Sequence, residues 1–426
     1  MEKLSGKTAL VTRSTDGVGR LVARKLGQAG ARVLVHGRDA ERSARVVADI
    51  EASGGAANFL AADLSALAEV RWTESLDEGA EGADAILFQL RIGGQAARQR
   101  DETWPLDCGC VGQETTGAGG LAKALRTVPV VLDLAERASR RASPSAFIID
   151  FTNPVGIVTR ALLTAGHRAV GLCNVAIGFQ REFASLLGVG PARLSLGHVG
   201  LNHLSWERSV LLDDVDVLPE LLGKFADDIA PHTGMPADFI RHLGMVPSYY
   251  LRYYYAHDAV VESLRGAATR AEAVARLEAE LLELYADPAL DTKPPQLAQR
   301  GGAWYSEAAV DLLLSLTRDR RDVQVVNMFN RGTLPFLPDD AVIEVPAVVG
   351  SAGAAPVRVD PVEPLLRGLI AHVYAYEELA LDAAIRGGRG RVYDALLAHP
   401  LVGQADQADC LTDRLLAENA AYLPWA

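Results

Sequence analysis

A glycine-containing turn near the N-terminus has residue types that suit the binding of a dinucleotide. The stretch "LVTRSTDGVGR" (10–20) places Thr12 at the end of an apolar segment and places Gly17 and Gly19 in the first turn of an expected helix. Glycines at such a place let the backbone approach a pyrophosphate, and the N–H groups at the helix start favour its negative charge. Arg13 stands where the tight turn favours glycine, because glycine tolerates backbone conformations that other residues do not.

A second position that could bind the cofactor is Arg38, at the end of the next apolar strand in "VHGRD". A guanidinium there suits the 2′-phosphate of NADP, whereas an acid suits the ribose hydroxyls of NAD. The segment therefore predicts dinucleotide binding, with a possible preference for NADP. The alternative is a Rossmann-type scaffold whose cofactor turn no longer binds.

The elements that must position these residues alternate between strands and helices. Strands expected over 7–12, 32–36 and 58–62, with helices over 17–29 and 40–52, form the parallel dinucleotide-binding half-unit. Further buried strands are expected at 84–90, 145–152 and 169–175, and a helix at 118–141. From about residue 191 the pattern favours antiparallel β structure, with a second β segment at 323–349 and long helices at 270–287, 303–317, 361–386 and 409–420.

Composition restricts the class of protein. The chain has 426 residues, 49% of them hydrophobic, and a formal net charge of −12, which argues against nucleic acid or an anionic membrane as the main partner. The sequence contains no apolar run of about 18 residues that could span a membrane, so we expect a soluble, cytoplasmic protein. The spacing of the four cysteines, Cys108, Cys110, Cys173 and Cys410, matches no zinc-finger pattern, and we expect them to be reduced.

The first 71 residues resemble the short-chain dehydrogenases. The glycine turn matches that family apart from Arg13, and "AADL" places Asp63 where the family contacts adenine. The catalytic Tyr-x-x-x-Lys pair of that family is missing, because no lysine of the chain has a tyrosine four positions before it. A reductase of that family is therefore not expected.

From about residue 72 to the C-terminus the chain resembles glycoside hydrolase family 4, the NAD- and metal-dependent 6-phosphoglycosidases. The resemblance rests on motifs that follow one another with family-like spacing: "GQETTGAGGLAKAL", "DFTNPVGIVTRAL", "GLCNVAIGF", "GLNHLSW", "VPSYYLRYYY", "TRAEAV" and "VVNMFNRGTLPFLPDDAVIEVP". It implies an α/β fold with a Rossmann-type parallel-sheet domain over 1–190 and a mixed α+β, lactate-dehydrogenase-like domain over 191–426. The usual family 4 cofactor turn is absent, so the chain looks like a composite.

The resemblance also implies the catalytic residues. Cys173 and His203 would hold a divalent metal, for which a thiolate and an imidazole are suitable ligands. Tyr250 would remove a proton from the sugar after a nearby cation has lowered its pKa, and Glu114 would tune that tyrosine. Asn174 after the cysteine is typical of the 6-phospho-β-glucosidase branch. Taken singly, these residues could also be core residues, and "YYLRYYY" could be an aromatic core patch.

Three further residues would bind the substrate, by the same resemblance. Asn153 would contact a sugar hydroxyl, and Arg98 and Arg270 would grip the phosphate, for which guanidinium geometry is suited. Arg91 and Arg100 are nearby alternatives, and each arginine could instead be a solvated helix charge.

The expected activity is hydrolysis of 6-phospho-β-glucosides. NAD, or NADP because of Arg38, would oxidise C3, elimination across C1–C2 would release the aglycone, and water addition and re-reduction would follow, with Mn²⁺ or another divalent metal bound. Two alternatives stay open: an NAD(P)-dependent sugar oxidoreductase, and an inactive composite that binds only a nucleotide or a phosphosugar. The expected partners are a phosphorylated sugar and further copies of the chain in a homo-oligomer, with no nucleic acid or membrane.

Overall fold

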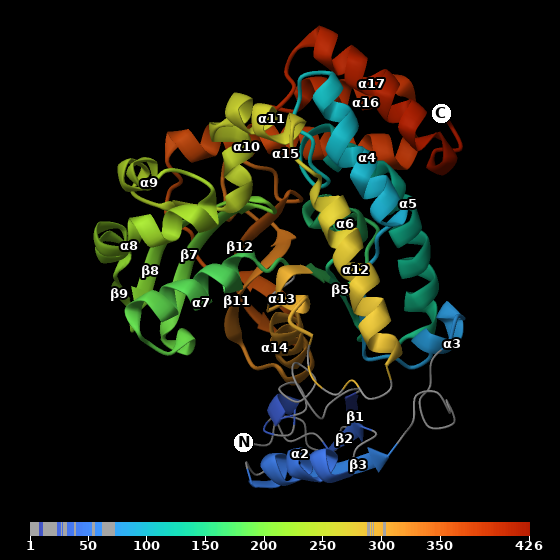
Figure 1. The fold of residues 1–426 in the computed structure, drawn as a ribbon, viewed down its shortest axis with the longest axis vertical. Helices are drawn as coiled ribbons and strands as arrows, with labels where there is room; N and C mark the ends of the chain where they lie inside the picture. Colours follow the sequence, from blue (N-terminus) through green and yellow to red (C-terminus); the bar gives the residue numbers. More distant parts are fainter. Residues whose placement is uncertain are drawn as a thin grey trace.

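The structure is a computed structural model, and it describes residues 8–11, 24–26, 28, 32–37, 40–52, 56–61, 73–287, 290, 292, 294–300 and 304–426. Within these residues the strands form two sheets, one of three strands and one of ten. Figure 1 shows the smaller sheet at one end of the molecule and the larger sheet in the middle, between layers of helices.

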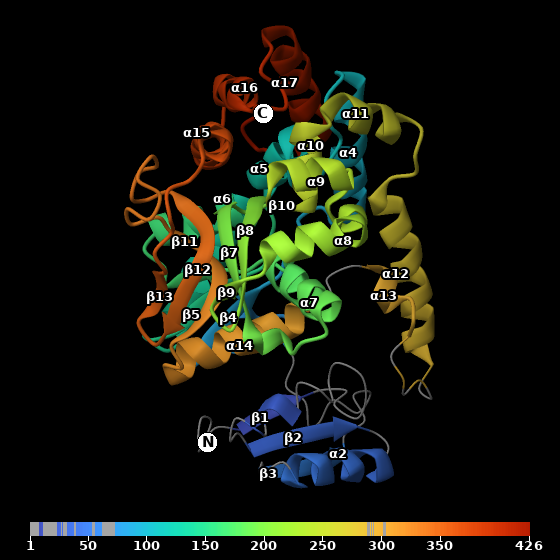
Figure 2. The ribbon, with the colours of Figure 1, turned by 90° about the vertical axis from the view of Figure 1, so that its left-hand side faces the viewer.

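The three-stranded sheet is parallel and comes from the N-terminal segment. Its strands lie in the order β1 (Thr8–Val11), β2 (Arg32–Gly37) and β3 (Ala56–Ala61), and α2 (Ala40–Ala52) connects the last two. Val46 and Ile50 lie one turn apart on α2, and both are buried, as is Val33 of β2. This spacing gives α2 an apolar face that packs against the sheet. Figure 2 places this unit at the opposite end of the molecule from the C-terminal helices.

The ten-stranded sheet joins a parallel part to an antiparallel part. The parallel part consists of β4 (Ala85–Phe88), β5 (Phe147–Asp150) and β6 (Ala169–Gly171). The antiparallel part consists of β7 (Leu194–Leu201), β8 (Leu204–Leu212), β9 (Val215–Asp216), β10 (Val246–Pro247), β11 (Asp322–Phe329), β12 (Val342–Gly350) and β13 (Gly353–Pro356). The two parts meet where β11 pairs with β6, so the strand order is β10-β8-β7-β12-β11-β6-β5-β4.

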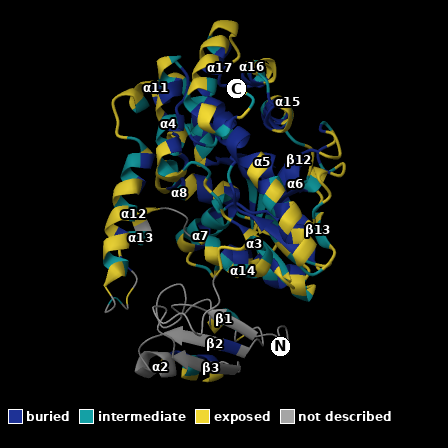
Figure 3. Cartoon of the chain, turned by 90° about the vertical axis from the view of Figure 1, so that its right-hand side faces the viewer, coloured by how far each residue is buried: buried dark blue, intermediate teal, exposed yellow. Residues whose placement is uncertain are grey.

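Helices surround this sheet, and several of them carry site residues at their ends. The first group is α3 (Leu76–Ala80), α4 (Gly94–Asp107), α5 (Gly117–Arg141), α6 (Val155–Thr164), α7 (Val175–Leu187), α8 (Leu218–Thr233) and α9 (Ala237–Leu243). The second is α10 (Arg252–Tyr255), α11 (His257–Arg265), α12 (Arg270–Ala286), α13 (Leu297–Arg300), α14 (Tyr305–Arg318), α15 (Pro364–Arg386), α16 (Arg389–Ala398) and α17 (Ala405–Asn419). Figure 3 shows buried strands inside and helices whose outer faces are exposed.

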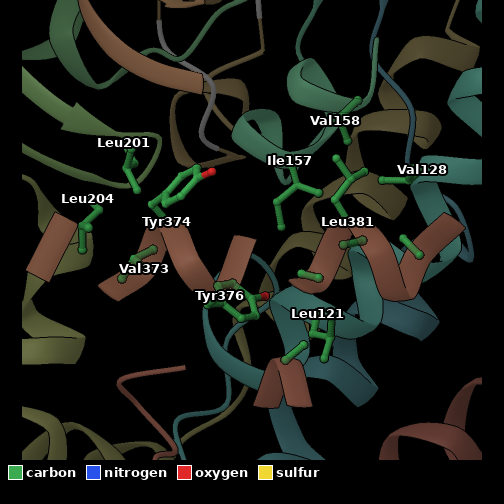
Figure 4. Close-up of a cluster of buried hydrophobic side chains, with 14 of the residues drawn as sticks. Leu121, Val128, Ile157, Val158, Leu201, Leu204, Val373, Tyr374, Tyr376 and Leu381 are labelled. Carbon is green, nitrogen blue, oxygen red and sulfur yellow. The ribbon is translucent and has the colours of Figure 1, made fainter. Parts of the chain in front are cut away.

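The main hydrophobic core lies between α5, α6 and α15. Leu121 and Val128 of α5 pack with Ile157 of α6 and Leu381 of α15, and all but Leu381 are at most 2% exposed (Figure 4). Burying side chains of this size contributes roughly 1.5–3 kcal/mol each. This core fixes the position of α5, whose first turn lies beside the candidate site.

The observed elements confirm the expected α/β class with a Rossmann-type sheet. The helix expected over 118–141 is Gly117–Arg141, and the antiparallel β structure expected from about residue 191 begins with β7 and β8. Of the helix expected over 17–29, the described residues 24–26 and 28 are helical. The expected domain boundary near residue 190 stays a prediction, and the ten-stranded sheet continues across it.

The expectation that all four cysteines are reduced is wrong for one pair. Cys108 at the end of α4 and Cys410 in α17 form a disulfide that joins residues 302 positions apart, while Cys110 and Cys173 are free and buried. Sequence spacing does not reveal this pair, because only the packing of α17 against α4 brings the two residues together. No helix among the described residues is long and apolar enough to span a membrane.

Candidate active site

The candidate site begins at the carboxyl ends of the three parallel strands of the large sheet. Arg91 follows β4, Asn153 follows β5, and Cys173 and Asn174 follow β6. Ligands of open α/β sheets bind at this edge, because loops from neighbouring parallel strands converge there. The side-chain oxygen Oδ1 of Asn153 is buried and has no hydrogen-bond partner among the described residues, which suits a contact to a substrate hydroxyl.

His203 comes to this edge on a tight turn between two antiparallel strands. Leu201 pairs with Leu204, so Asn202 and His203 form the two-residue turn from β7 to β8. The φ angle of His203 is +62°, a conformation that costs a non-glycine residue on the order of 1–3 kcal/mol and that clusters at functional sites. The His203 ring stacks on Tyr250, with ring centroids 3.7 Å apart and planes 13° apart.

A buried charge network holds this turn in place, and the sequence analysis missed it. The Nδ1 atom of His198 lies 2.7 Å from Oε1 of Glu207, and its Nε2 atom lies 3.3 Å from Oε1 of Glu344. Burial by itself would lower the pKa of His198, but the two carboxylates raise it to about 10, so the ring is charged. Glu344 also accepts a hydrogen bond of 3.0 Å from Asn202, the first residue of the turn. Removing these groups would therefore release the turn that carries His203.

Cys173 interacts with the side chain of Asn202, and His203 follows Asn202 in the turn, so the chemistry of Cys173 and His203 suits one divalent metal. Burial lowers the pKa of His203 to about 4, so the imidazole is neutral near pH 7 and keeps a lone pair for a ligand. The Cys173 thiol is fully buried, and burial raises its pKa. Among the described residues no group of three or more His, Cys, Asp or Glu side chains converges on a metal site. Two protein ligands would leave the remaining positions of a metal to substrate and water, as in a catalytic site.

Tyr250 stands in a short 3-10 turn, Tyr249–Leu251. Burial raises the pKa of Tyr250 well above its ordinary value, and the charges of Cys173 and Glu114 raise it further. We expected a nearby cation and the metal to lower this pKa, and that stays a prediction. A bound cation would favour the phenolate and so make Tyr250 a base at neutral pH.

Glu114 does not contact Tyr250 directly but lies at the centre of a buried cluster of cations. Its carboxylate bonds to Lys123 Nζ at 2.6 Å and to Arg98 Nε at 3.1 Å, and it also pairs with Arg91. Although burial alone would raise the pKa of Glu114, the charges of Lys123, Arg91 and Arg98 lower it to about 2. Burial lowers the pKa of Lys123 to about 8, in spite of the neighbouring carboxylate. The cluster is therefore a preorganised group of charges.

Glu102 connects the two arginines expected to bind a phosphate. One oxygen of Glu102 accepts from Arg98 Nε at 2.7 Å, and the other accepts from the Ala271 backbone N–H at 2.8 Å. Ala271 lies in the first turn of α12, directly after Arg270, so α4 and the start of α12 meet at this carboxylate. The Arg270 side chain is exposed and donates to the backbone oxygen of Gln299 at 2.6 Å.

The site therefore groups some of the expected residues more closely than others. His203 stacks on Tyr250, Cys173 interacts with Asn202 next to His203, and Arg98 and Glu114 form an ion pair. Arg91, an alternative with less support, pairs with Glu114, and Arg100 instead lies near Glu418 on the exposed side of α4. Asn174 begins α7. The expected cofactor residues Thr12, Gly17, Gly19, Arg38 and Asp63 lie outside the described residues.

Comparison with known families supports both resemblances seen in the sequence. A model of family 4 glycosyl hydrolases matches residues 47–189, and the model of the C-terminal domain of that family matches 198–402. The chain belongs to glycosyl hydrolase family 4. A short chain dehydrogenase model matches residues 7–75, which confirms the second resemblance at the N-terminus. In this family 4 member the family match begins before residue 72, and the two matches overlap over 47–75.

Several family 4 relatives match most of the chain. A probable 6-phospho-β-glucosidase of Bacillus subtilis is 38% identical over 358 residues, which are 80% of each chain. The 6-phospho-β-glucosidase of Escherichia coli is 34% identical, over 82% of this chain and 80% of its own. The structure of a 6-phospho-β-glucosidase from Thermotoga maritima with manganese, NAD⁺ and glucose-6-phosphate matches 98% of this family 4 chain and 99% of its own, with a TM-score of 0.79 and 28% identity.

Proposed function

We propose that this family 4 chain hydrolyses 6-phospho-β-glucosides and uses NAD and a divalent metal such as Mn²⁺. The observation that carries the proposal is that the turn at the edge where the parallel strands end joins these residues: Asn202 interacts with Cys173, and His203 stacks on Tyr250. The three 6-phospho-β-glucosidases named above support the β configuration, as does Asn174 after the cysteine.

The cofactor and the metal supply chemistry that the side chains lack. Bound NAD would accept and later return the hydride at C3, and a bound divalent metal held by Cys173 and His203 would polarise the C2 and C3 oxygens. Oxidation at C3 makes the C2 proton acidic, and Tyr250 removes that proton while the aglycone leaves C1. Asn153 offers its buried oxygen to a sugar hydroxyl and so orients the ring. Water then adds at C1, and C3 is reduced again, so no pair of catalytic carboxylates is needed.

The phosphate of the substrate would bind near Arg98. This arginine is held between Glu114 and Glu102, and the start of α12 with Arg270 lies against the same Glu102. Preorganised guanidinium groups bind phosphate strongly because they donate several charge-assisted hydrogen bonds in a fixed geometry. The glucose-6-phosphate in the Thermotoga maritima structure supports a phosphorylated sugar as ligand.

The choice of cofactor, the location and the assembly state belong to the same proposal. Arg38 predicts a preference for NADP, although the solved relatives carry NAD.

A phosphorylated sugar does not cross a membrane unaided, which supports a cytoplasmic enzyme. A disulfide such as Cys108–Cys410 is uncommon in that compartment. Counting free thiols immediately after cell lysis tests the location, and light scattering tests the proposed homo-oligomer.

The activity can be tested with 4-nitrophenyl 6-phospho-β-glucoside, with and without NAD and Mn²⁺. We expect nitrophenol release only when both are present, a large loss in Tyr250→Phe and no comparable loss in Tyr249→Phe. Tyr249 is a matched control because it is adjacent but 38% exposed. Reduced cofactor without nitrophenol would indicate a sugar oxidoreductase, and binding without either product would indicate an inactive composite.

A further inference from the structure

The His203 ring has a hydrogen-bonding partner in addition to its stacking on Tyr250. Its Nδ1 atom lies 3.0 Å from the hydroxyl oxygen Oγ1 of Thr115. An imidazole that binds a metal through one nitrogen usually donates the hydrogen of the other nitrogen to a nearby acceptor, which fixes the tautomer and the ring orientation. Whether Thr115 can act as that acceptor depends on where its own hydroxyl hydrogen points.

Gln113 determines the direction of the Thr115 hydroxyl. The backbone N–H of Thr115 can only donate, and it points at the side-chain Oε1 of Gln113, so this atom of the amide must be the oxygen. The Thr115 hydroxyl also lies 2.9 Å from the same oxygen and donates to it. The hydroxyl hydrogen is then used, and a lone pair of Thr115 Oγ1 remains for His203 Nδ1–H.

The loop that carries these two residues is fixed by close packing against the first turn of α5. A Cβ atom added to Gly119 would lie 2.3 Å from the backbone oxygen of Gln113, and one added to Gly120 would lie 2.6 Å from the carbonyl carbon of Thr115. Side chains at either position would displace the loop. The glycines of "TTGAGG" therefore let the first turn of α5 pack against the backbone of Gln113 and Thr115, which keeps the Thr115 hydroxyl within hydrogen-bonding distance of His203.

We propose that the relay from Gln113 through Thr115 sets the tautomer of His203, with the proton on Nδ1 and the lone pair on Nε2, ready for the metal. Thr115 and Gln113 are thus positioning residues that act through His203. This inference rests on the proposed role of His203 as a metal ligand. It goes further because it assigns a function to two residues that the proposed mechanism does not use.

The first test is the affinity for Mn²⁺, measured by isothermal titration calorimetry on the full chain without substrate. Thr115→Val keeps the shape but removes the acceptor, and we expect a Kd about 10- to 100-fold higher. Thr115→Ser restores the hydroxyl and should bind Mn²⁺ as the wild type does. Thr116→Val makes the same chemical change one residue away, at a hydroxyl outside the relay, and should leave the Kd unchanged. Equal Kd values for Thr115→Val and wild type would overturn the proposal, as would an equal loss in Thr115→Ser.

The second test reports the tautomer directly and does not need the metal. In ¹⁵N-histidine-labelled protein, the His203 signals, assigned by comparison with His203→Ala, should show an unprotonated Nε2 in the wild type and in Thr115→Ser. A protonated Nε2 in the wild type would contradict the relay. If Thr115→Val does not fold, Gln113→Met serves instead, because it frees the hydroxyl to donate to Nδ1 and should also weaken Mn²⁺ binding.

His203→Ala separates the failure of this inference from the failure of the proposed function. If His203→Ala binds Mn²⁺ as the wild type does, the metal ligand itself has been assigned wrongly. If His203→Ala loses Mn²⁺ while Thr115→Val keeps it, the ligand stands and the relay fails.

Discussion

Replacing Glu114 by glutamine tests whether one carboxylate holds the buried cation cluster together. Glutamine has nearly the same shape, but it leaves Lys123, Arg91 and Arg98 around a neutral amide. Lys123 is almost fully buried and bonds to no other carboxylate, so its charge would lose its partner. We therefore expect Glu114→Gln to be less stable than the wild type, and we expect the difference to depend on pH.

The size of the effect follows from the pKa of Glu114, which falls from 4.5 to about 2 on folding. This change corresponds to roughly 3 kcal/mol of stabilisation at pH 7, because each pKa unit is worth about 1.4 kcal/mol. Since the pKa is lowered in the folded state, the stabilisation is present above about pH 4.5 and is lost as the pH falls through about 2. The same relation leaves roughly 1 kcal/mol at pH 3.

The measurement is urea-induced unfolding followed by tryptophan fluorescence at pH 7 and at pH 3. Glu136→Gln is the matched control, because Glu136 is exposed and pairs with Arg140 only at the surface of α5, where such pairs contribute about 0–1 kcal/mol. A destabilisation of Glu114→Gln that is equal at both pH values would refute the electrostatic reasoning. So would a loss at pH 7 no larger than that of the control.

Three further predictions concern the rest of the molecule. Burial raises the pKa of Asp150 to about 8, so the wild type should lose stability as the pH rises from about 4 to 8. In urea unfolding at pH 8, Asp150→Asn should therefore be more stable than the wild type by a few kcal/mol. The same dependence of stability on pH in the variant and the wild type would contradict this. Arg98→Gln should weaken binding of a 6-phosphoglucoside on the order of 10- to 150-fold in calorimetry, with little effect on the unphosphorylated glucoside, and equal losses for both would remove the phosphate role. NADP should bind more tightly than NAD, and Arg38→Asp should reverse the order, so tighter NAD binding by the wild type would disprove the argument from Arg38.

Local pattern predicted most of the elements because each element carries its own periodicity. The strand at 145–152 contains the apolar run "AFII", and the second half of the helix at 118–141 buries Val128, Val131, Ala135 and Ala138, which are three or four residues apart, so both were expected close to where they lie. The motifs also identified Cys173, His203 and Tyr250, which lie on separate elements. Their meeting beside the strand ends depends on the fold and was expected only through the family resemblance.

The contacts that the sequence did not predict are of two kinds. Some join residues that are far apart in the chain, and others involve charged residues that are buried although their type predicts exposure. The Cys108–Cys410 bond depends on the packing of α17 against α4, and no spacing rule describes it. Lys123 interrupts the buried face of α5, and a lysine on an alanine- and leucine-rich face could have signalled a buried carboxylate partner. Thr115 gave no such signal, because its role depends on a hydrogen bond to a residue 88 positions away.

The proposed mechanism breaks the glycosidic bond by elimination after proton removal at C2. Turnover of a 6-phospho-β-glucoside in D₂O with NAD and Mn²⁺, followed by NMR of the product sugar, shows whether this proton is exchanged. We expect deuterium at C2 of the glucose-6-phosphate formed, and no turnover in Tyr250→Phe. A product formed at full rate with only hydrogen at C2 would contradict it and would indicate direct displacement at C1.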